Sequence, residues 1–260
     1  KRPTDGWAYY AYCVLDDDFS PEEFPGPITP LDNMRVTAAH EYFHAVQFGY
    51  DLGEDLWFME ATATWAEDEV YDSVNDNLQY LSSGPLGRPD LSVDYGGDNM
   101  RYGGWIFFRY LTERMRSSTG GMPTLVRDMW RRADSRGADK YSMQAVRREV
   151  RQRHVRWSST FARFAEAGRR PRRVYDEGRA QRYPAAPLAF SRITLSRSQR
   201  STGVRTEQLN HLTSASARVV PGRDLTNRRW RLRLRVDMAD KVTGSVAIAT
   251  IRLSSERQRW

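Results

Sequence analysis

The sequence predicts an α+β protein in which a mainly helical part, residues 1–180, precedes a small β-sandwich-like part, residues 181–260. Three observations support this division. The first part holds long segments without glycine or proline whose apolar residues recur at helical spacing. The sequence pattern changes at Arg169-Arg170-Pro171-Arg172-Arg173, and short segments with the composition of β-strands begin near residue 187. A hydrophobic content of 40 % and an aromatic content of 12 % are enough for a packed core.

The helix predicted over residues 30–48 has the clearest ends. Thr29 offers a hydroxyl N-cap, Pro30 fits the first helical position, Asp32 places a carboxylate three residues after the cap, and Gly49 fits the stop. Apolar residues on most sides of this helix predict that it is buried. Periodicity indicates further helices near 56–71, 75–82, 103–117, 123–134, 140–152 and 157–168.

Strands are predicted at both ends of the chain. The aromatic-rich segment from Trp7 to Leu15 ends at Asp16-Asp17-Asp18, which indicates a strand and a solvated turn, because the other ligands of a calcium loop are missing. Cys13 has apolar neighbours and is expected to be a small core residue. Further strands are predicted at 193–195, 217–220, 230–236 and 245–251; the third alternates strictly with arginine, which indicates a solvent-exposed face.

One pentapeptide carries most of the chemical information. Residues 40–44 read His-Glu-Tyr-Phe-His, so half of the 4 histidines of the chain stand four apart in one predicted helix. Residues four apart lie one turn above each other, which lets His40 and His44 bind one metal ion. Glu41 lies about 100° round the helix, where its carboxylate can reach a metal-bound water. The pattern predicts a site for one zinc ion; the alternative is a degenerate site that has lost its metal.

The third ligand has to come from another segment. Gln47 and Tyr50 stand where the extended metzincin pattern requires glycine and histidine, so that class is excluded, and His154 and His211 have no ligand-like neighbours. Glu60 is the best candidate, because it is a lone acid in a helix that is predicted to be buried, and an unpaired buried charge is costly. The alternative places Glu60 in solvent. The remaining acids near the motif are expected to be surface charges: Glu54, Asp55, Glu67, Asp68 and Glu69.

These two segments resemble a known family. Residues 39–47 and 57–68 are similar to the gluzincin metallopeptidases of clan MA, and 55–61 resembles the ligand helix of the M1-family aminopeptidases. The paired segments resemble more closely still a group of secreted bacterial zinc metallopeptidases. The similarity is strongest over residues 36–80. It implies a zincin-like catalytic domain over 1–180, an extracellular location, His40, His44 and Glu60 as ligands of one Zn²⁺, and Glu41 as general base.

The sequence also departs from the M1 pattern. The Gly-x-Met-Glu-Asn signature that holds a substrate's amino terminus is absent, and the spacing from His44 to Glu60 is shorter. The resemblance therefore does not decide between exopeptidase and endopeptidase action. By the same resemblance, the predicted strand over residues 7–15 either pairs with an extended substrate or is an interior strand.

A gluzincin also needs a donor for the oxyanion. Tyr102 precedes two glycines and an apolar helix, in an order similar to the surroundings of the catalytic tyrosine in M1 enzymes, although the offset differs by about one residue. Packing at the helix start is the alternative role for Tyr102, and Tyr95 is the next candidate. Thr64 lies one turn beyond Glu60, where it either orients a ligand or packs between helices.

Charge and hydropathy restrict the function classes. Residues 1–100 hold 4 Lys and Arg against 20 Asp and Glu, whereas residues 101–260 hold 36 against 13. The acidic half contains the metal motif, and its potential favours cations. The basic half contains no recognised nucleic-acid-binding motif, so no nucleic-acid partner is expected. No run of 18 apolar residues occurs, so no membrane span is expected, and the start at Lys1-Arg2 indicates a mature or trimmed product.

The sequence therefore predicts a zinc-dependent peptidase that acts on a peptide or protein substrate. One alternative is a non-catalytic protein that uses the zinc site structurally and its basic β part to contact an acidic partner. Another is hydrolysis of a non-peptide bond at the same site. The oligomeric state does not follow from the sequence.

Overall fold

The computed structural model describes residues 6–225, 231–238 and 244–246. The helical part follows the predicted order closely. Its α-helices are α1 (Pro30–Phe48), α2 (Leu56–Val70), α3 (Met100–Gly103), α4 (Trp105–Arg114), α5 (Leu125–Ala133), α6 (Met143–Gln152), α7 (Trp157–Gly168) and α8 (Pro171–Val174). Two 3₁₀-helices, η1 (Asp76–Tyr80) and η2 (Arg223–Leu225), complete the helical elements of the described residues.

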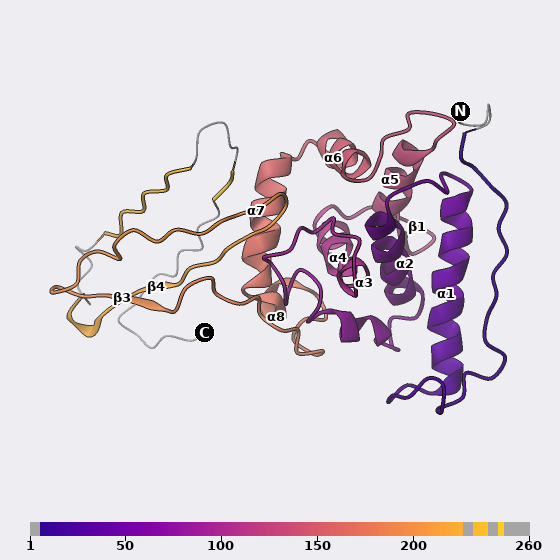
Figure 1. Cartoon of the computed structure of the whole chain (residues 1–260), viewed down its shortest axis with the longest axis horizontal. Helices are drawn as coiled ribbons and strands as arrows, with labels where there is room; N and C mark the ends of the chain where they lie inside the picture. Colours follow the sequence, from indigo (N-terminus) through magenta and orange to yellow (C-terminus); the bar gives the residue numbers. More distant parts are fainter. Residues whose placement is uncertain (1–5, 226–230, 239–243, 247–260) are drawn as a thin grey trace.

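The helices lie in a row that starts with α1 at one end and reaches α7 and α8 at the other (Figure 1). α2 packs against α1 on one side and against α3 and α4 on the other, while α5 packs on α6. α2, which carries Glu60, is therefore the central helix, with α1 on one side and α3 and α4 on the other. None of the helices in the described ranges is long and apolar enough to cross a membrane.

The start of α1 is formed as the sequence predicts. Thr29 is the N-cap, and its hydroxyl accepts a hydrogen bond of 3.2 Å from the backbone N–H of Asp32, while Pro30 occupies the first turn. The predicted burial of α1 is wrong, because only Val36 and Gln47 of this helix are buried. Tyr42, in the middle of the motif, is 68 % exposed.

An aromatic core surrounds α2. Trp57 and Phe58 at its start are completely buried, and the ring of Phe58 stacks on Trp130 of α5 with centroids 4.5 Å apart. Trp57 stacks on Phe108 of α4 at 5.5 Å. These contacts fix α2 against α4 and α5, and thereby fix the backbone that carries Glu60.

Two glycines let α3 approach η1. A Cβ atom at Gly103 would lie 2.4 Å from Cα of Gly84 and 2.6 Å from the carbonyl oxygen of Tyr80, so the two backbones touch only because side chains are absent. This close approach places Tyr102 of α3 beside Tyr80 of η1, with ring centroids 5.1 Å apart. Both tyrosines are thereby held near the motif helix.

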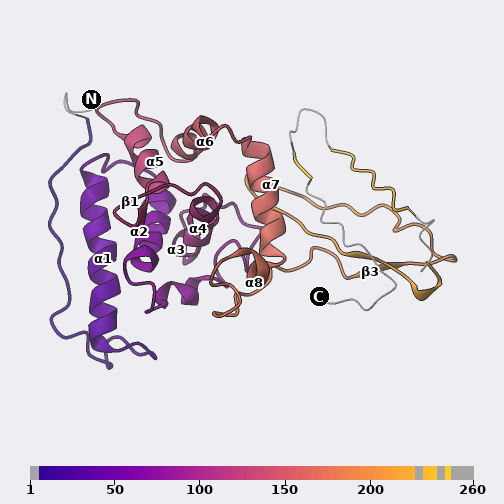
Figure 2. The ribbon, with the colours of Figure 1, turned by 180° about the vertical axis from the view of Figure 1, so that it is seen from behind.

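The predicted strand over residues 7–15 is not formed. The segment runs along α1 (Figures 1 and 2) and is joined to the following turn by two backbone hydrogen bonds of 2.8 Å, from Tyr9 to Phe48 and from Leu52 to Trp7. No described strand lies beside it to form a ladder, and all of residues 9–15 are exposed. Cys13 is exposed, and its prediction as a core residue is wrong.

The sheets are small. β1 (Ser118–Thr119) pairs antiparallel with β2 (Met122–Pro123) across Gly120 and Gly121, whose φ angles of +60° and +87° suit glycine. β3 (Ile193–Leu195) and β4 (Val219–Pro221) pair in parallel, with Ile193 opposite Val219. The coarse prediction of an α+β protein is confirmed. Residues 231–236 form no strand in the described ranges, while residue 230 and most of 245–251 lie outside them.

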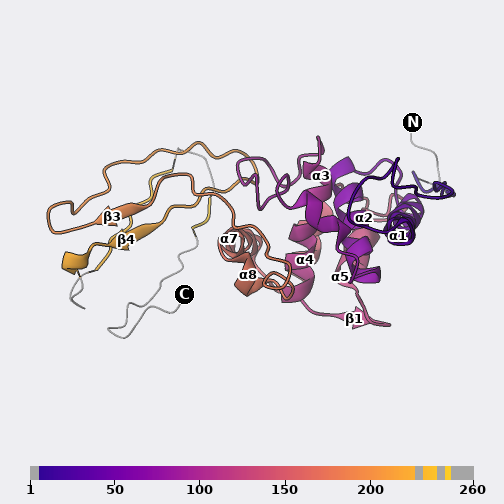
Figure 3. The same ribbon diagram turned by 90° about the horizontal axis from the view of Figure 1, so that it is seen from below.

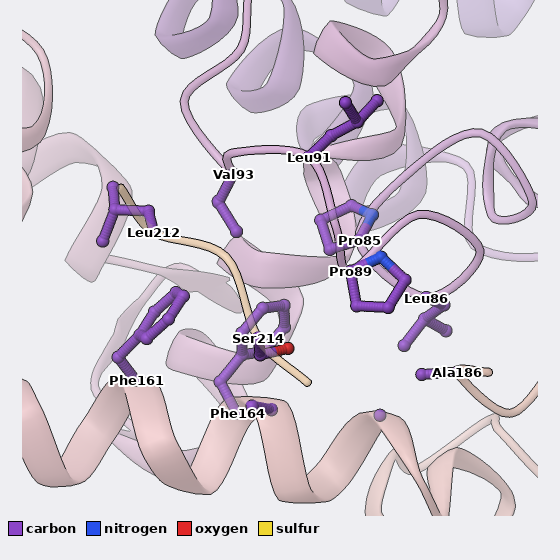
Figure 4. A pocket seen from close by; sticks show the side chains of 12 residues that line it. Pro85, Leu86, Pro89, Leu91, Val93, Phe161, Phe164, Ala186, Leu212 and Ser214 are labelled. Carbon is purple, nitrogen blue, oxygen red and sulfur yellow. The ribbon is translucent and has the colours of Figure 1, made fainter. Parts of the chain in front are cut away.

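The β3–β4 pair lies in an arm that extends beyond α7 (Figure 3). At its base, backbone hydrogen bonds join Val93 to Leu212 at 3.2 Å and Ser214 to Pro89 at 2.8 Å. Figure 4 shows the apolar gap left there, in which Phe161 and Phe164 of α7 face the two segments. Its free volume of about 10 Å³ holds roughly one water molecule, so this gap is a packing seam and not a ligand pocket.

Candidate metal centre

α1 and α2 bring the three predicted ligands together. One ligand atom from each of His40, His44 and Glu60 lies within 4.8 Å of the others. Oε2 of Glu60 is 3.1 Å from Nε2 of His40 and 3.4 Å from Nε2 of His44. The side chains are only 12 %, 15 % and 14 % exposed, respectively. Two imidazole nitrogens and one carboxylate oxygen therefore converge in a largely dry site that still opens to solvent.

The other nitrogen of each imidazole has its own partner. Nδ1 of His40 lies 2.5 Å from Oε1 of Glu67, and Nδ1 of His44 lies 2.6 Å from Oε1 of Gln47. Since these oxygens accept, Nδ1 of each ring is a donor. In a neutral ring this leaves the lone pair on Nε2, on the side of Glu60, whereas a protonated His40 donates from Nε2 to Glu60 at 3.1 Å. Acceptors of this kind fix the tautomer and the ring direction of histidines that bind zinc.

Gln47 is itself held in place. Its amide group donates hydrogen bonds of 2.9 Å to the carbonyl oxygen of Met59 and 3.0 Å to the hydroxyl of Thr62, which also accepts from the indole of Trp130 at 3.1 Å. The amide orientation follows from these two acceptors, so its oxygen must face His44. Thr64, the predicted ligand-orienting candidate, is buried and has no hydrogen-bond partner in the described residues, in agreement with the packing alternative.

The electrostatics of the cluster favour positive charge. Burial opposes charge on His40, but the hydrogen bonds that its ring donates to Glu60 and Glu67 outweigh this effect and raise its pKa to about 9. Burial likewise raises the pKa of Glu60, but the two histidines outweigh this effect and lower it to about 2. Burial raises the pKa of Glu67 to about 7. Two carboxylates around His40 thus stabilise a cation at this point.

The predicted general base is adjacent to the cluster. Glu41 follows His40 on α1, is partly buried, and has no hydrogen-bond or ion-pair partner among the described residues. An unpaired carboxylate beside the two candidate ligand histidines is available to accept a proton from a water molecule.

Two tyrosines border the centre. The ring of Tyr102 lies 6.1 Å from the ring of His40, while Nη2 of Arg101 is 3.4 Å from the Tyr102 hydroxyl. Tyr80 stacks on Tyr102, and its pKa is raised by burial and by the charges of Asp76, Glu67 and Glu60. Tyr95, the second candidate from the sequence, is 44 % exposed and has no described contact with the cluster.

The sequence analysis missed Tyr80, Gln47 and Glu67 as parts of this centre. The signal for Glu67 was present, because it lies seven residues, or two helical turns, after Glu60 and therefore on the same face of α2. The other two histidines lie away from the cluster as expected: His154 is exposed, and exposed His211 is 3.2 Å from Asp94.

The expected surface positions of the acids near the motif are wrong in several cases. Glu54, Glu67 and Asp68 are only 7 %, 6 % and 3 % exposed, and Asp55 and Glu69 are partly buried. The reason is that partners come from distant segments. Glu54 accepts from the backbone N–H of Ser142 at 2.8 Å, and Asp55 from the Ser142 hydroxyl at 2.8 Å.

Comparisons with known proteins add no family assignment: no protein-family model, curated protein or solved structure matches the chain at a significant level. The functional argument therefore depends on the residues and their geometry.

Proposed function

We propose that this protein is a zinc hydrolase, and more specifically a peptidase of the gluzincin type. The convergence of His40, His44 and Glu60 from two helices carries the proposal. The donor set fits zinc, because two imidazoles and a carboxylate are its usual ligands at catalytic centres and leave a fourth position open. The hydrogen bonds that the two Nδ1 atoms donate to Glu67 and Gln47 support the same interpretation, since they direct both Nε2 atoms into the site.

When bound, zinc would supply a Lewis acid that polarises the scissile carbonyl and acidifies a water molecule. The residues of the chain then have separate tasks. Glu41 accepts the proton of the attacking water, because its carboxylate is unpaired and lies beside the ligands. The hydroxyl of Tyr102 donates a hydrogen bond to the oxygen on which negative charge develops. Its nearness to Arg101 supports this role, since a guanidinium favours negative charge nearby.

The peptide substrate, the zincin-like domain and the extracellular location are part of this proposal through the family resemblance of residues 36–80. The β-sandwich-like part belongs to it through the strand-like composition that begins near residue 187. The acidic half of the chain supports a substrate with basic residues.

The test combines metal analysis with a broad peptide-cleavage screen. Wild type and Glu41→Gln should each bind one zinc ion, and only the wild type should cleave. Glu22→Gln, which removes an exposed carboxylate outside the centre, is the matched control and should keep full activity. A wild type that binds no zinc refutes the proposal. Zinc binding without chelator-sensitive cleavage of any bond would support the non-catalytic alternative, and metal-dependent cleavage of non-peptide substrates alone would refute the peptidase assignment.

A further inference from the structure

A second group of carboxylates lies at the other end of α2. Asp68 on the last turns of α2, Asp72 just after this helix and Glu177 after α8 each offer an oxygen within 4.8 Å of the others. Asp68 is 3 % exposed, whereas Asp72 is exposed to solvent. The group thus joins two segments more than 100 residues apart in the chain at a point with access to water.

This region has an excess of negative charge. Arg109 of α4 pairs with Asp68, Glu113 and Glu177 at 3.0 Å each and with Glu69 at 3.4 Å. In the described part of the chain, Arg109 is the basic side chain that pairs with Asp68 or Glu177. One guanidinium therefore pairs with four carboxylates, and buried negative charge in such excess is costly without another cation.

The charge excess is concentrated between Asp72 and Glu177. Oε1 of Glu177 accepts from Arg109, but its Oε2 is shielded from solvent and has no hydrogen-bond partner. Burial and the contact with Asp72 raise the pKa of Glu177 to about 8. Two carboxylates in such contact need a positive charge between them, either a proton or a metal ion.

Two neutral oxygens beside the group also have no partner. Asn77 of η1 is 2 % exposed and donates from Nδ2 to Oδ1 of Asp68 at 2.7 Å, while its own Oδ1 is unpartnered. Tyr183 is completely buried and its hydroxyl is likewise unpartnered. Burial and the nearby charges of Asp68 and Glu177 raise the pKa of this hydroxyl. Buried amide and hydroxyl oxygens rarely lack partners in folded proteins, so these two unpartnered oxygens point to a further ligand.

We propose that Asp68, Asp72 and Glu177 form a calcium site. All the available donors are oxygens, which calcium prefers, and the absence of nitrogen and sulfur donors among these three distinguishes the site from the His40 cluster. Calcium accepts six to eight oxygen ligands in flexible geometry. The exposed side at Asp72 lets water molecules complete the shell, and Oδ1 of Asn77 offers an uncharged ligand. Bound calcium would fasten the end of α2 to the segment that carries Glu177 and Tyr183.

The chain offers an internal control. Asp16, Asp17 and Asp18 also bring three carboxylates within 4.8 Å. There, however, Asp16 accepts from the backbone N–H groups of Asp18 and Phe19 at 3.1 and 2.5 Å, as in a solvated turn. That group involves no distant segment and no orphaned buried oxygen, so it should not hold calcium.

The test uses the full chain, saturated with zinc to remove any contribution of the histidine centre. Terbium(III), which takes calcium sites, should luminesce on excitation of the aromatic side chains, because the ring of Trp105 lies 6.1 Å from that of Tyr183 beside the site. Calcium should displace the terbium, and calcium without terbium should raise the melting temperature. Magnesium should displace terbium more weakly.

Asp72→Asn should weaken calcium binding about tenfold or more, because one of three charged ligands is lost. Asp17→Asn, in the other aspartate group, should bind like the wild type. The proposal is wrong if the wild type neither sensitises terbium nor gains thermal stability with calcium, in which case a proton neutralises the pair. It is also wrong if Asp72→Asn binds calcium like the wild type, or if Asp17→Asn loses the signal equally. None of these outcomes depends on zinc or on peptidase activity.

Discussion

The hydrogen bond between Glu67 and His40 allows a quantitative test of how the proposed zinc centre is held. Glu67 is 6 % exposed and its oxygen lies 2.5 Å from Nδ1 of His40, so water screens the interaction very little. Residues in this position typically change zinc affinity by about 10- to 100-fold when mutated. Glu67→Gln keeps an oxygen that accepts from Nδ1 but removes the charge, so we expect about tenfold weaker zinc binding, or about 1.4 kcal/mol.

Glu67→Ala removes both the charge and the acceptor. His40 then loses the contact that fixes its tautomer, and we expect about 100-fold weaker binding, close to 2.7 kcal/mol. If zinc affinity falls from the wild type to Glu67→Gln and again to Glu67→Ala, the first step measures the contribution of the charge and the second that of the hydrogen bond. Competition against a chromophoric zinc chelator gives the three dissociation constants, and circular dichroism checks that each variant is folded.

Glu69→Gln is the matched control, because it removes a carboxylate from the same helix that is 13 % exposed and pairs with Arg109 instead of a histidine. Its zinc affinity should equal that of the wild type. The reasoning is refuted if Glu67→Gln and Glu67→Ala both bind zinc as tightly as the wild type. It is equally refuted if Glu69→Gln loses as much affinity, since the loss would then reflect the total charge of α2.

Further predictions concern stability and catalysis. Burial raises the pKa of Glu54 from 4.5 to about 7. Ionisation of Glu54 therefore costs the folded state up to about 3 kcal/mol as pH rises through this range. Glu54→Gln should raise the free energy of unfolding in urea by about this amount at pH 8 and change it little at pH 4.5. Phe58→Ala should cost about 3–5 kcal/mol in the same assay, because this ring is completely buried, whereas Tyr10→Ala at a fully exposed position should change it by less than about 0.5 kcal/mol. Tyr102→Phe should lower kcat about 100-fold with unchanged zinc content, and Tyr95→Phe should leave kcat unchanged.

Local rules predicted the motif helix well, and they identified the three side chains that converge in the cluster. The ends of α1 depend on Thr29 and Pro30, whose effects are confined to one helical turn. The pairing of His40 with His44 depends only on helix geometry. Glu60 was found from a more general argument, that a lone carboxylate in an apolar helix needs a cation, and the structure places it beside both histidines.

The argument that a buried carboxylate needs a cation was not extended to the neighbouring acids. Their burial was judged from the polar composition of the helix end and not from the face of α2 on which each acid lies. Glu67, Asp68 and Glu69 stand in a polar cluster at the end of α2, which is typical of a solvated helix end. Their burial depends on His40 and Arg109, whose positions relative to α2 are set by tertiary packing. No local pattern contains that information.

The predicted strand over residues 7–15 failed for a related reason. Its composition favours an extended backbone, and the segment is indeed extended beside α1, but a strand also needs a neighbour whose backbone completes the ladder. The described residues supply no such neighbour.

The two proposed ion sites share α2, and the helix geometry shows how one short segment can serve both. Glu67 and Asp68 are consecutive, so their side chains leave the helix about 100° apart. One therefore reaches His40 of α1 while the other reaches Arg109 of α4, on opposite flanks of the central helix. A cation on either flank reduces the charge repulsion between these adjacent buried carboxylates. The dense acidity of this helix end, which looks like a solvated surface in the sequence, is thus better explained by cations held on two different sides of α2.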